Sequence, residues 1–87
     1  MRALIAEHVV IPERVLEMDT SEVSFVETVF RTDQSGHRSI HEVYRAPSRD
    51  QAIAYLKARP VFEKLYYREV DTPEGTFGRD IKGIYKL

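Results

Sequence analysis

Residues 63–87, EKLYYREVDTPEGTFGRDIKGIYKL, decide the fold that this sequence favours. The stretch reads as two strands joined by a tight turn at residues 71–75. Its first half is rich in tyrosine and valine, which pack well on a pleated, half-buried surface. Pro73 has the φ angle required at the second position of a type I turn, and Gly75 supplies the positive φ needed to enter the next strand. The stretch therefore predicts a C-terminal antiparallel hairpin.

The returning half of this hairpin is expected to form a single curved strand. Phe77, Ile81 and Tyr85 are separated by even steps, so they should lie on one face of it. Gly78 and Gly83 interrupt the pattern and indicate a bulge or a bend, with a glycine-lined ligand contact as the less favoured alternative.

The same residues carry a resemblance. The pattern consists of the TPEG sequence at 72–75, Gly78, Asp80-Ile81 and Gly83-Ile84-Tyr85. It resembles the end of a group of small uncharacterised bacterial proteins of cyanobacterial type. The resemblance covers only residues 72–87, and it implies no activity and no functional residues.

Length and composition indicate one small domain spanning residues 1–87. The chain contains no cysteine, which excludes disulfides and thiolate metal sites and fits a reducing compartment. No apolar run approaches the roughly 20 residues of a membrane helix. Glu7 and His8 end the first apolar run too early for a signal peptide. We therefore expect a cytoplasmic protein without membrane association.

Charge is unevenly distributed along the chain. The net charge of −1 argues against dominant attraction to nucleic acid or membrane. Residues 1–30 contain two basic and six acidic side chains, a net charge of −4, whereas residues 31–87 contain eleven and eight, a net charge of +3. An acidic N-terminal third can cover a basic remainder within one molecule or across a dimer.

The N-terminal part predicts an extended segment at residues 3–10 and a short helix at 12–18, where Pro12 suits the first turn. The alternative is that residues 1–21 form an arm that packs on a partner chain.

Residues 22–32 and 37–45 predict two strands joined by the loop Asp33-Gln34-Ser35-Gly36. Residues 22–32 carry apolar side chains at both odd and even positions. We therefore expect this first strand to be central in the sheet or covered on both sides.

The main helix is predicted at residues 49–58. Ser48 is a good N-cap, and Gln51 three residues later suggests a capping box. Pro60 ends the helix. An apolar stripe gives the helix one buried face, formed by Ala52, Ile53 and Leu56 with Tyr55 beside it. From residue 22 the order is ββαββ, so we expect an α+β fold with an antiparallel sheet of about four strands and the helix on one face. The strand order stays open.

No catalytic, metal or cofactor site is predicted. Asp80, Lys82 and an earlier acid, Asp71 or Glu69, match part of a metal-dependent hydrolase pattern, but the tripeptide at 80–82 is common and a solvated strand face is favoured. His37 and His41 are about 13 Å apart in a strand, too far to share a metal, so surface positions are favoured for both. His8 suggests no site. No serine lies in a Gly-x-Ser-x-Gly motif, and no glycine loop for phosphate is present.

The favoured function is a non-catalytic protein-interaction module. We expect it to self-associate as a homodimer, with another protein as the alternative partner. Tyrosine and arginine are enriched at the centres of protein interfaces, and they interleave in this chain. The same composition also fits a single-stranded nucleic-acid binder or tyrosines that line the core. The expected interface anchors are Tyr66, Tyr67, Arg68 and Tyr85.

Overall fold

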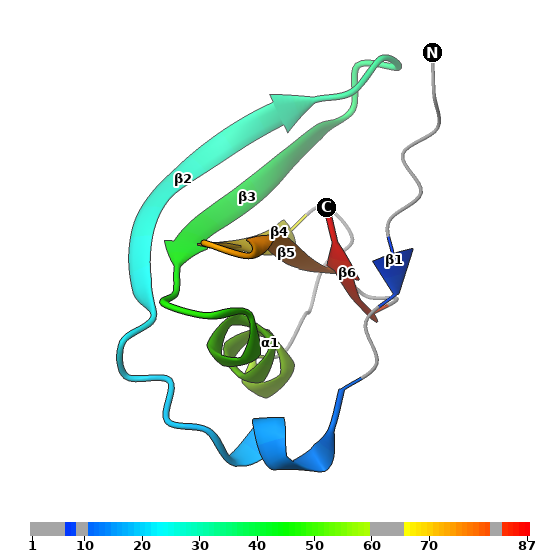
Figure 1. The fold of residues 1–87 in the computed structure, drawn as a ribbon. Helices are drawn as coiled ribbons and strands as arrows, with labels where there is room; N and C mark the ends of the chain where they lie inside the picture. Colours follow the sequence, from blue (N-terminus) through cyan, green and yellow to red (C-terminus); the bar gives the residue numbers. More distant parts are fainter. Residues whose placement is uncertain (1–6, 9–10, 60–65, 81–82) are drawn as a thin grey trace.

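The computed structural model describes residues 7–8, 11–59, 66–80 and 83–87, and shows one sheet with two helical segments on one face (Figure 1). The helical segments are the 3-10 helix η1 (Glu13–Glu17) and α1 (Arg49–Ala58). The strands are β1 (Glu7–His8), β2 (Ser24–Thr32), β3 (Arg38–Arg45), β4 (Tyr66–Thr72), β5 (Gly75–Asp80) and β6 (Gly83–Lys86). The predicted α+β class and the bounds of the main helix are confirmed.

The sheet is mixed, with strand order β1-β6-β5-β4-β3-β2, and not antiparallel throughout as predicted. β3 and β4 run parallel, with Val43 opposite Glu69, while the other neighbouring strands are antiparallel. The parallel pair arises because α1 is a crossover connection, which carries the chain back so that β4 runs in the direction of β3.

The returning half of the C-terminal hairpin forms two strands, β5 and β6, where one curved strand was expected. β5 and β6 are antiparallel, and Asp80 lies opposite Gly83, whose φ of 154° favours glycine. The expectation that Phe77 and Tyr85 share a face is therefore wrong. Ile84 joins Phe77 in the core, and Tyr85 lies on the opposite side of the sheet because neighbouring strand residues alternate. Ile81 lies outside the described residues.

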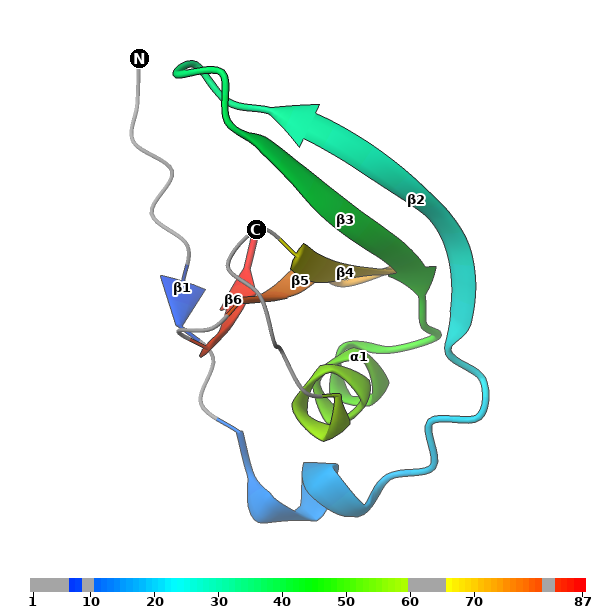
Figure 2. The ribbon, with the colours of Figure 1, turned by 180° about the vertical axis from the view of Figure 1, so that it is seen from behind.

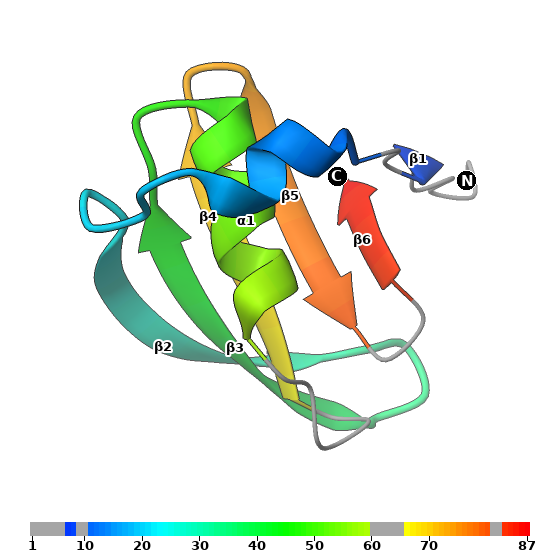
Figure 3. The same cartoon turned by 90° about the horizontal axis from the view of Figure 1, so that it is seen from below.

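The helical segments form two layers over one face of the sheet. α1 packs on β4, β5 and β6, and η1 packs on α1 from the other side (Figure 3). Val15 of η1 is fully buried against this helix. Because α1 is covered on two sides, all five residues from 52 to 56 are buried, not only the predicted stripe. The predicted short helix near Pro12 is thus present, as a 3-10 helix.

The N-terminus of α1 is capped by two side chains. The Ser48 hydroxyl accepts a hydrogen bond from the Gln51 amide (3.2 Å), as expected of an N-cap. A carboxylate oxygen of Glu74, from the turn between β4 and β5, accepts from the Arg49 amide (2.9 Å). The predicted capping box does not form, because the Gln51 side chain donates to the Asp19 carbonyl instead (3.2 Å).

The C-terminus of α1 is bound by one guanidinium. Arg79 of β5 donates from Nη1 to the carbonyl oxygens of Leu56, Lys57 and Arg59, at 2.5, 3.0 and 2.6 Å. These carbonyls lie at the end of the helix, where the regular i+4 amide donors are missing; Leu56 accepts in addition from the Arg59 amide (3.3 Å). A cation at this end also complements the helix dipole.

The β2–β3 hairpin is closed by a loop organised around Asp33. The Asp33 amide donates to the His37 carbonyl (2.9 Å), and its carboxylate accepts from the Ser35 hydroxyl (2.7 Å) and the His37 amide (2.9 Å). The Ser35 hydroxyl first, and then the His37 amide, lower the pKa of Asp33 below its ordinary value of 3.8.

β2 is an edge strand, so the prediction that it is central or covered on both sides is wrong. Figure 2 shows it at the outer margin of the sheet, and eight of its nine residues are exposed. Its apolar residues on both parities are therefore not explained by burial within the domain. Neither helical segment of the described chain is long and apolar enough to cross a bilayer.

We predict that Arg79→Met lowers the free energy of unfolding by about 2 kcal/mol, because charge-assisted hydrogen bonds to the end of α1 are lost while the apolar stem remains. Urea unfolding followed by circular dichroism measures the change. Lys57→Met removes an exposed cation from the same helix end and is the matched control. Equal effects of the two substitutions would contradict the role given to Arg79.

The loop carboxylate gives a second prediction. The folded pKa of Asp33 lies below the unfolded value, so its contribution to stability is complete above about pH 4 and disappears as the pH falls through the folded pKa. Carboxyl-detected NMR titration should give a pKa below 3.8. Ser35→Ala should move that pKa upward, and an unchanged titration would show that the hydroxyl does not hold the carboxylate.

Candidate functional site

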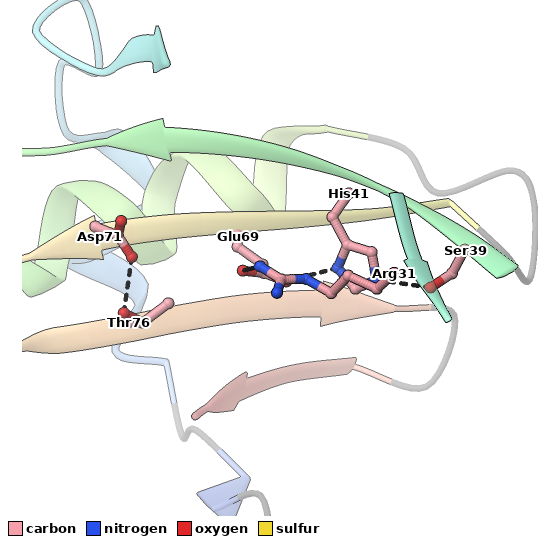
Figure 4. A network of polar contacts seen from close by, with 6 residues as sticks. All are labelled: Arg31, Ser39, His41, Glu69, Asp71 and Thr76. Carbon is pink, nitrogen blue, oxygen red and sulfur yellow. Dashed lines mark hydrogen bonds and ion pairs between the residues drawn. The ribbon is translucent and has the colours of Figure 1, made fainter. Parts of the chain in front are cut away.

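A chain of polar side chains crosses the face of the sheet opposite α1, here called the open face (Figure 4). The Ser39 hydroxyl lies 2.8 Å from His41 Nε2, and His41 Nδ1 lies 2.5 Å from a carboxylate oxygen of Glu69. Arg31 Nη2 donates to the other oxygen of Glu69 at 3.2 Å. The side chains of His41 and Glu69 are only 14% and 13% exposed, so the contact between these two side chains is largely shielded from water.

The strands explain why these residues meet. Ser39 and His41 are two apart on β3 and so point to the same face. In the parallel register His41 lies opposite Tyr67, and Glu69 lies two residues further along β4, opposite Val43, so His41 and Glu69 are diagonal neighbours on one face. Arg31 lies opposite Ser39 in the antiparallel β2–β3 pair. Each contact therefore follows from strand pairing and from the pleat.

The order serine, histidine, carboxylate matches that of a hydrolase triad, but the setting does not complete one. Such a triad needs N–H groups aimed at a developing oxyanion. β3 and β4 are interior strands, so their amides point along the sheet into the hydrogen-bond ladders and not out of the open face. A hollow of about 490 Å³ lies near Glu22, Arg45 and Asp71, and none of these belongs to the chain of contacts. The contacts fit a structural role, in which His41 and Glu69 hold one another and Arg31 in place, better than they fit catalysis of acyl transfer.

The predicted anchors are divided between the two sides of the sheet. Tyr67 lies on the open face, where its ring stacks on His41 with centroids 4.9 Å apart. Tyr85, opposite Gly78, is half-buried on the same face. Tyr66 pairs with Ile40 in the parallel register, and its side chain lies outside the described part of the structure.

Arg68 lies on the side of the sheet that faces α1. Its Nε donates to Glu42 (3.2 Å), which also accepts from the Tyr44 hydroxyl (2.8 Å). Burial, and then the hydrogen bond to Glu42, raise the pKa of Tyr44. Tyr44 also packs against Tyr55 of α1, with ring centroids 5.0 Å apart. Arg68 thus belongs to a network that borders the core.

The register bears differently on the two acids of the metal-dependent alternative: Glu69 lies opposite Gly78, two residues before Asp80, whereas Asp71 is further away. Asp71 lies opposite Thr76 and accepts its hydroxyl at 2.7 Å. Asp80 is four residues further along β5, which places the two backbones about 13 Å apart. The side chain of Asp80 and the whole of Lys82 lie outside what the structure describes. In the described residues no group of three histidine, cysteine or acidic side chains could hold a metal ion.

The outer edge of β2 is the second unusual surface. Phe25, Val26 and Phe30 are 54%, 44% and 61% exposed, and no described strand pairs with the outer side of β2. Phe25 contacts Tyr44 edge-on at 5.5 Å between centroids, and the Arg38 guanidinium lies 5.3 Å from the Phe30 ring. An edge strand with exposed apolar residues is a template for pairing with another chain.

Sequence reasoning missed both the polar cluster and the exposed edge. The Ser39-x-His41 spacing was a usable signal, because it places both side chains on one face of a strand. Glu69 could not be added to them, since the parallel pairing of β3 with β4 depends on a strand order that the sequence does not determine. The expected surface position is confirmed for His37, which lies in the exposed hairpin loop 2.8 Å from Ser35, and is wrong for His41, whose side chain is only 14% exposed.

We predict that Glu69→Gln lowers the free energy of unfolding by about 1–2 kcal/mol, because shielded charge-assisted contacts to His41 and Arg31 are weakened. Thermal and urea unfolding measure the effect. Glu17→Gln alters an exposed carboxylate in η1 and should change stability by less than about 0.5 kcal/mol. A neutral effect of Glu69→Gln would remove the structural role given to the cluster.

Comparison with known proteins adds no functional assignment. No family model, no curated protein and no solved structure matches this chain. Because a fold alone does not specify function, the function of this chain has to be inferred from the geometry of the surfaces described above.

Proposed function

We propose that this chain is a non-catalytic protein-interaction module and that it binds its partner by strand addition at the outer edge of β2. The observation that carries the proposal is the combination of a nine-residue edge strand with three exposed large apolar side chains. Strand addition takes its affinity from main-chain hydrogen bonds and its specificity from alternate side chains. A cytoplasmic location, predicted from the cysteine-free sequence, is part of this proposal.

The backbone of β2 supports the proposal. The Asp33 amide bonds to the His37 carbonyl, which makes residues 33 and 37 a hydrogen-bonded pair. Such pairs alternate along an antiparallel ladder, so the odd-numbered residues 27, 29 and 31 bond to β3. The N–H and C=O groups of Thr28 and Phe30 therefore point away from the sheet, where an added strand would meet them.

The open face supports protein binding better than nucleic-acid binding. A single-strand binder needs cations that are available to phosphates beside aromatic rings. Arg31, on the open face, is engaged by Glu69 of the same chain, and Arg68, on the opposite side of the sheet, is engaged by Glu42. Tyr67 is stacked on His41. Tyr66, Tyr67, Arg68 and Tyr85 remain predicted contacts of the module, secondary to the β2 edge.

The proposal predicts that Thr28→Pro abolishes partner binding without unfolding the domain. Its amide points outward, so proline removes a donor from the edge and none from the β2–β3 ladder. Tagged wild-type and variant proteins are compared in nuclease-treated extract of the source cells, and bound proteins are quantified by mass spectrometry. Thr28→Val, which keeps the amide, is the matched control.

Phe30→Lys provides an independent variant, because a lysine on an edge strand opposes pairing while leaving the amides in place. Circular dichroism must show that each variant is folded. Strand addition is supported if Thr28→Pro and Phe30→Lys each lose a bound protein that Thr28→Val retains. Partners retained by all variants, or lost on nuclease treatment alone, would overturn it.

A further inference from the structure

We propose that the strand added to β2 is the β2 strand of a second copy of this chain, antiparallel to the first, about a two-fold axis that passes through Val29. This inference rests on the proposed function and specifies the partner. It follows from three properties of β2: the direction of its backbone groups, the positions of its charges and the exposure of its aromatic residues.

The backbone limits how two copies of β2 can pair. From Glu27 onward, the outward-facing N–H and C=O groups of β2 belong to even-numbered residues, so these must lie opposite even-numbered residues of the second strand. A two-fold axis must then pass through a residue and not between two residues. An axis at Val29 places Thr28 opposite Phe30 of the second copy, and each such pair exchanges both backbone hydrogen bonds.

Charge distinguishes among the axes that the backbone allows. With the axis at Val29, Glu27 of each copy lies opposite Arg31 of the other, in pairs without backbone hydrogen bonds, where side chains approach most closely. An axis at Thr28 places Glu27 opposite Val29 and Arg31 opposite Phe25. An axis at Phe30 places Glu27 opposite Asp33, a pair of like charges. Only the axis at Val29 makes both charges complementary.

The side chains are available for these contacts. Glu27 is exposed, and the side chain of Arg31 is 54% exposed although one of its nitrogens contacts Glu69. Arg31 can therefore lie between two carboxylates, Glu69 of its own chain and Glu27 of the second copy. Arg31 would thereby connect the charged pairs of the interface to the polar cluster of the open face.

The apolar residues agree with the same register. Phe30 is 61% exposed, and in this register the two Phe30 rings are diagonal neighbours across the new strand pair, within the reach of aromatic side chains. The register of β2 with β3 shifts between Phe25 and Glu27. Such a bulge twists an edge away from a partner, so pairing about Val29 is confined to residues 27–31.

A charge-exchange experiment tests the register. The wild-type chain should sediment at about 20 kDa, twice its monomer mass of 10.1 kDa, at micromolar concentration. Glu27→Arg and Arg31→Glu each place like charges opposite each other at both pairs, so each variant alone should dissociate at least tenfold more readily. An equimolar mixture of the two variants should form a heterodimer, because every charge then meets its opposite.

The outcomes separate this inference from the proposed function. Association of the mixture, measured by sedimentation equilibrium and absent for either variant alone, supports the Val29 register. A wild-type dimer that dissociates with Thr28→Pro but shows no recovery in the mixture overturns the register and retains the edge as the interface. A monomeric wild-type chain whose cellular partner is lost with Thr28→Pro overturns self-pairing and leaves strand addition to a different protein.

Discussion

The position of α1 is fixed by one hairpin that holds both of its ends. Glu74, in the turn between β4 and β5, binds the first amide of the helix, and Arg79, on β5, binds its last carbonyls. An acid at the N-terminus and a base at the C-terminus both complement the helix dipole. Because β4 and β5 also form the centre of the sheet, helix and sheet cannot shift relative to each other without breaking charge-assisted hydrogen bonds.

The rest of the arrangement depends on this constraint. With α1 fixed against β4 and β5, the chain must return from β3 through the helix, which makes β4 parallel to β3. The β2–β3 hairpin is then placed beside β4 with β2 outermost. The same crossover brings Glu69 next to His41 on the open face. The polar cluster and the exposed edge are thus both consequences of how the helix is held.

The sequence predicts the local elements better than their arrangement. Ser48 and Pro60 mark the ends of α1, and Pro73 with Gly75 marks the hairpin, because capping and turn chemistry depend on residues close in the chain. Strand neighbours depend on contacts between distant segments, and so the parallel pair and the junction of His41 with Glu69 were not predicted. Apolar residues at both odd and even positions are typical of a strand buried within its domain, and they led to the wrong prediction that β2 is central. In the structure, Phe25 and Phe30 of β2 are exposed.

An exposed apolar edge must be restricted if it is to bind one partner and not aggregate. In β2 the bulge near Val26 shortens the segment that can pair. Glu27 and Arg31 then penalise registers that bring a charge opposite an apolar residue or a like charge. Arg31 is oriented by Glu69, which is held in turn by His41. The shielded cluster therefore gives the edge a defined charge pattern, and this pattern is what makes a single register of pairing favourable.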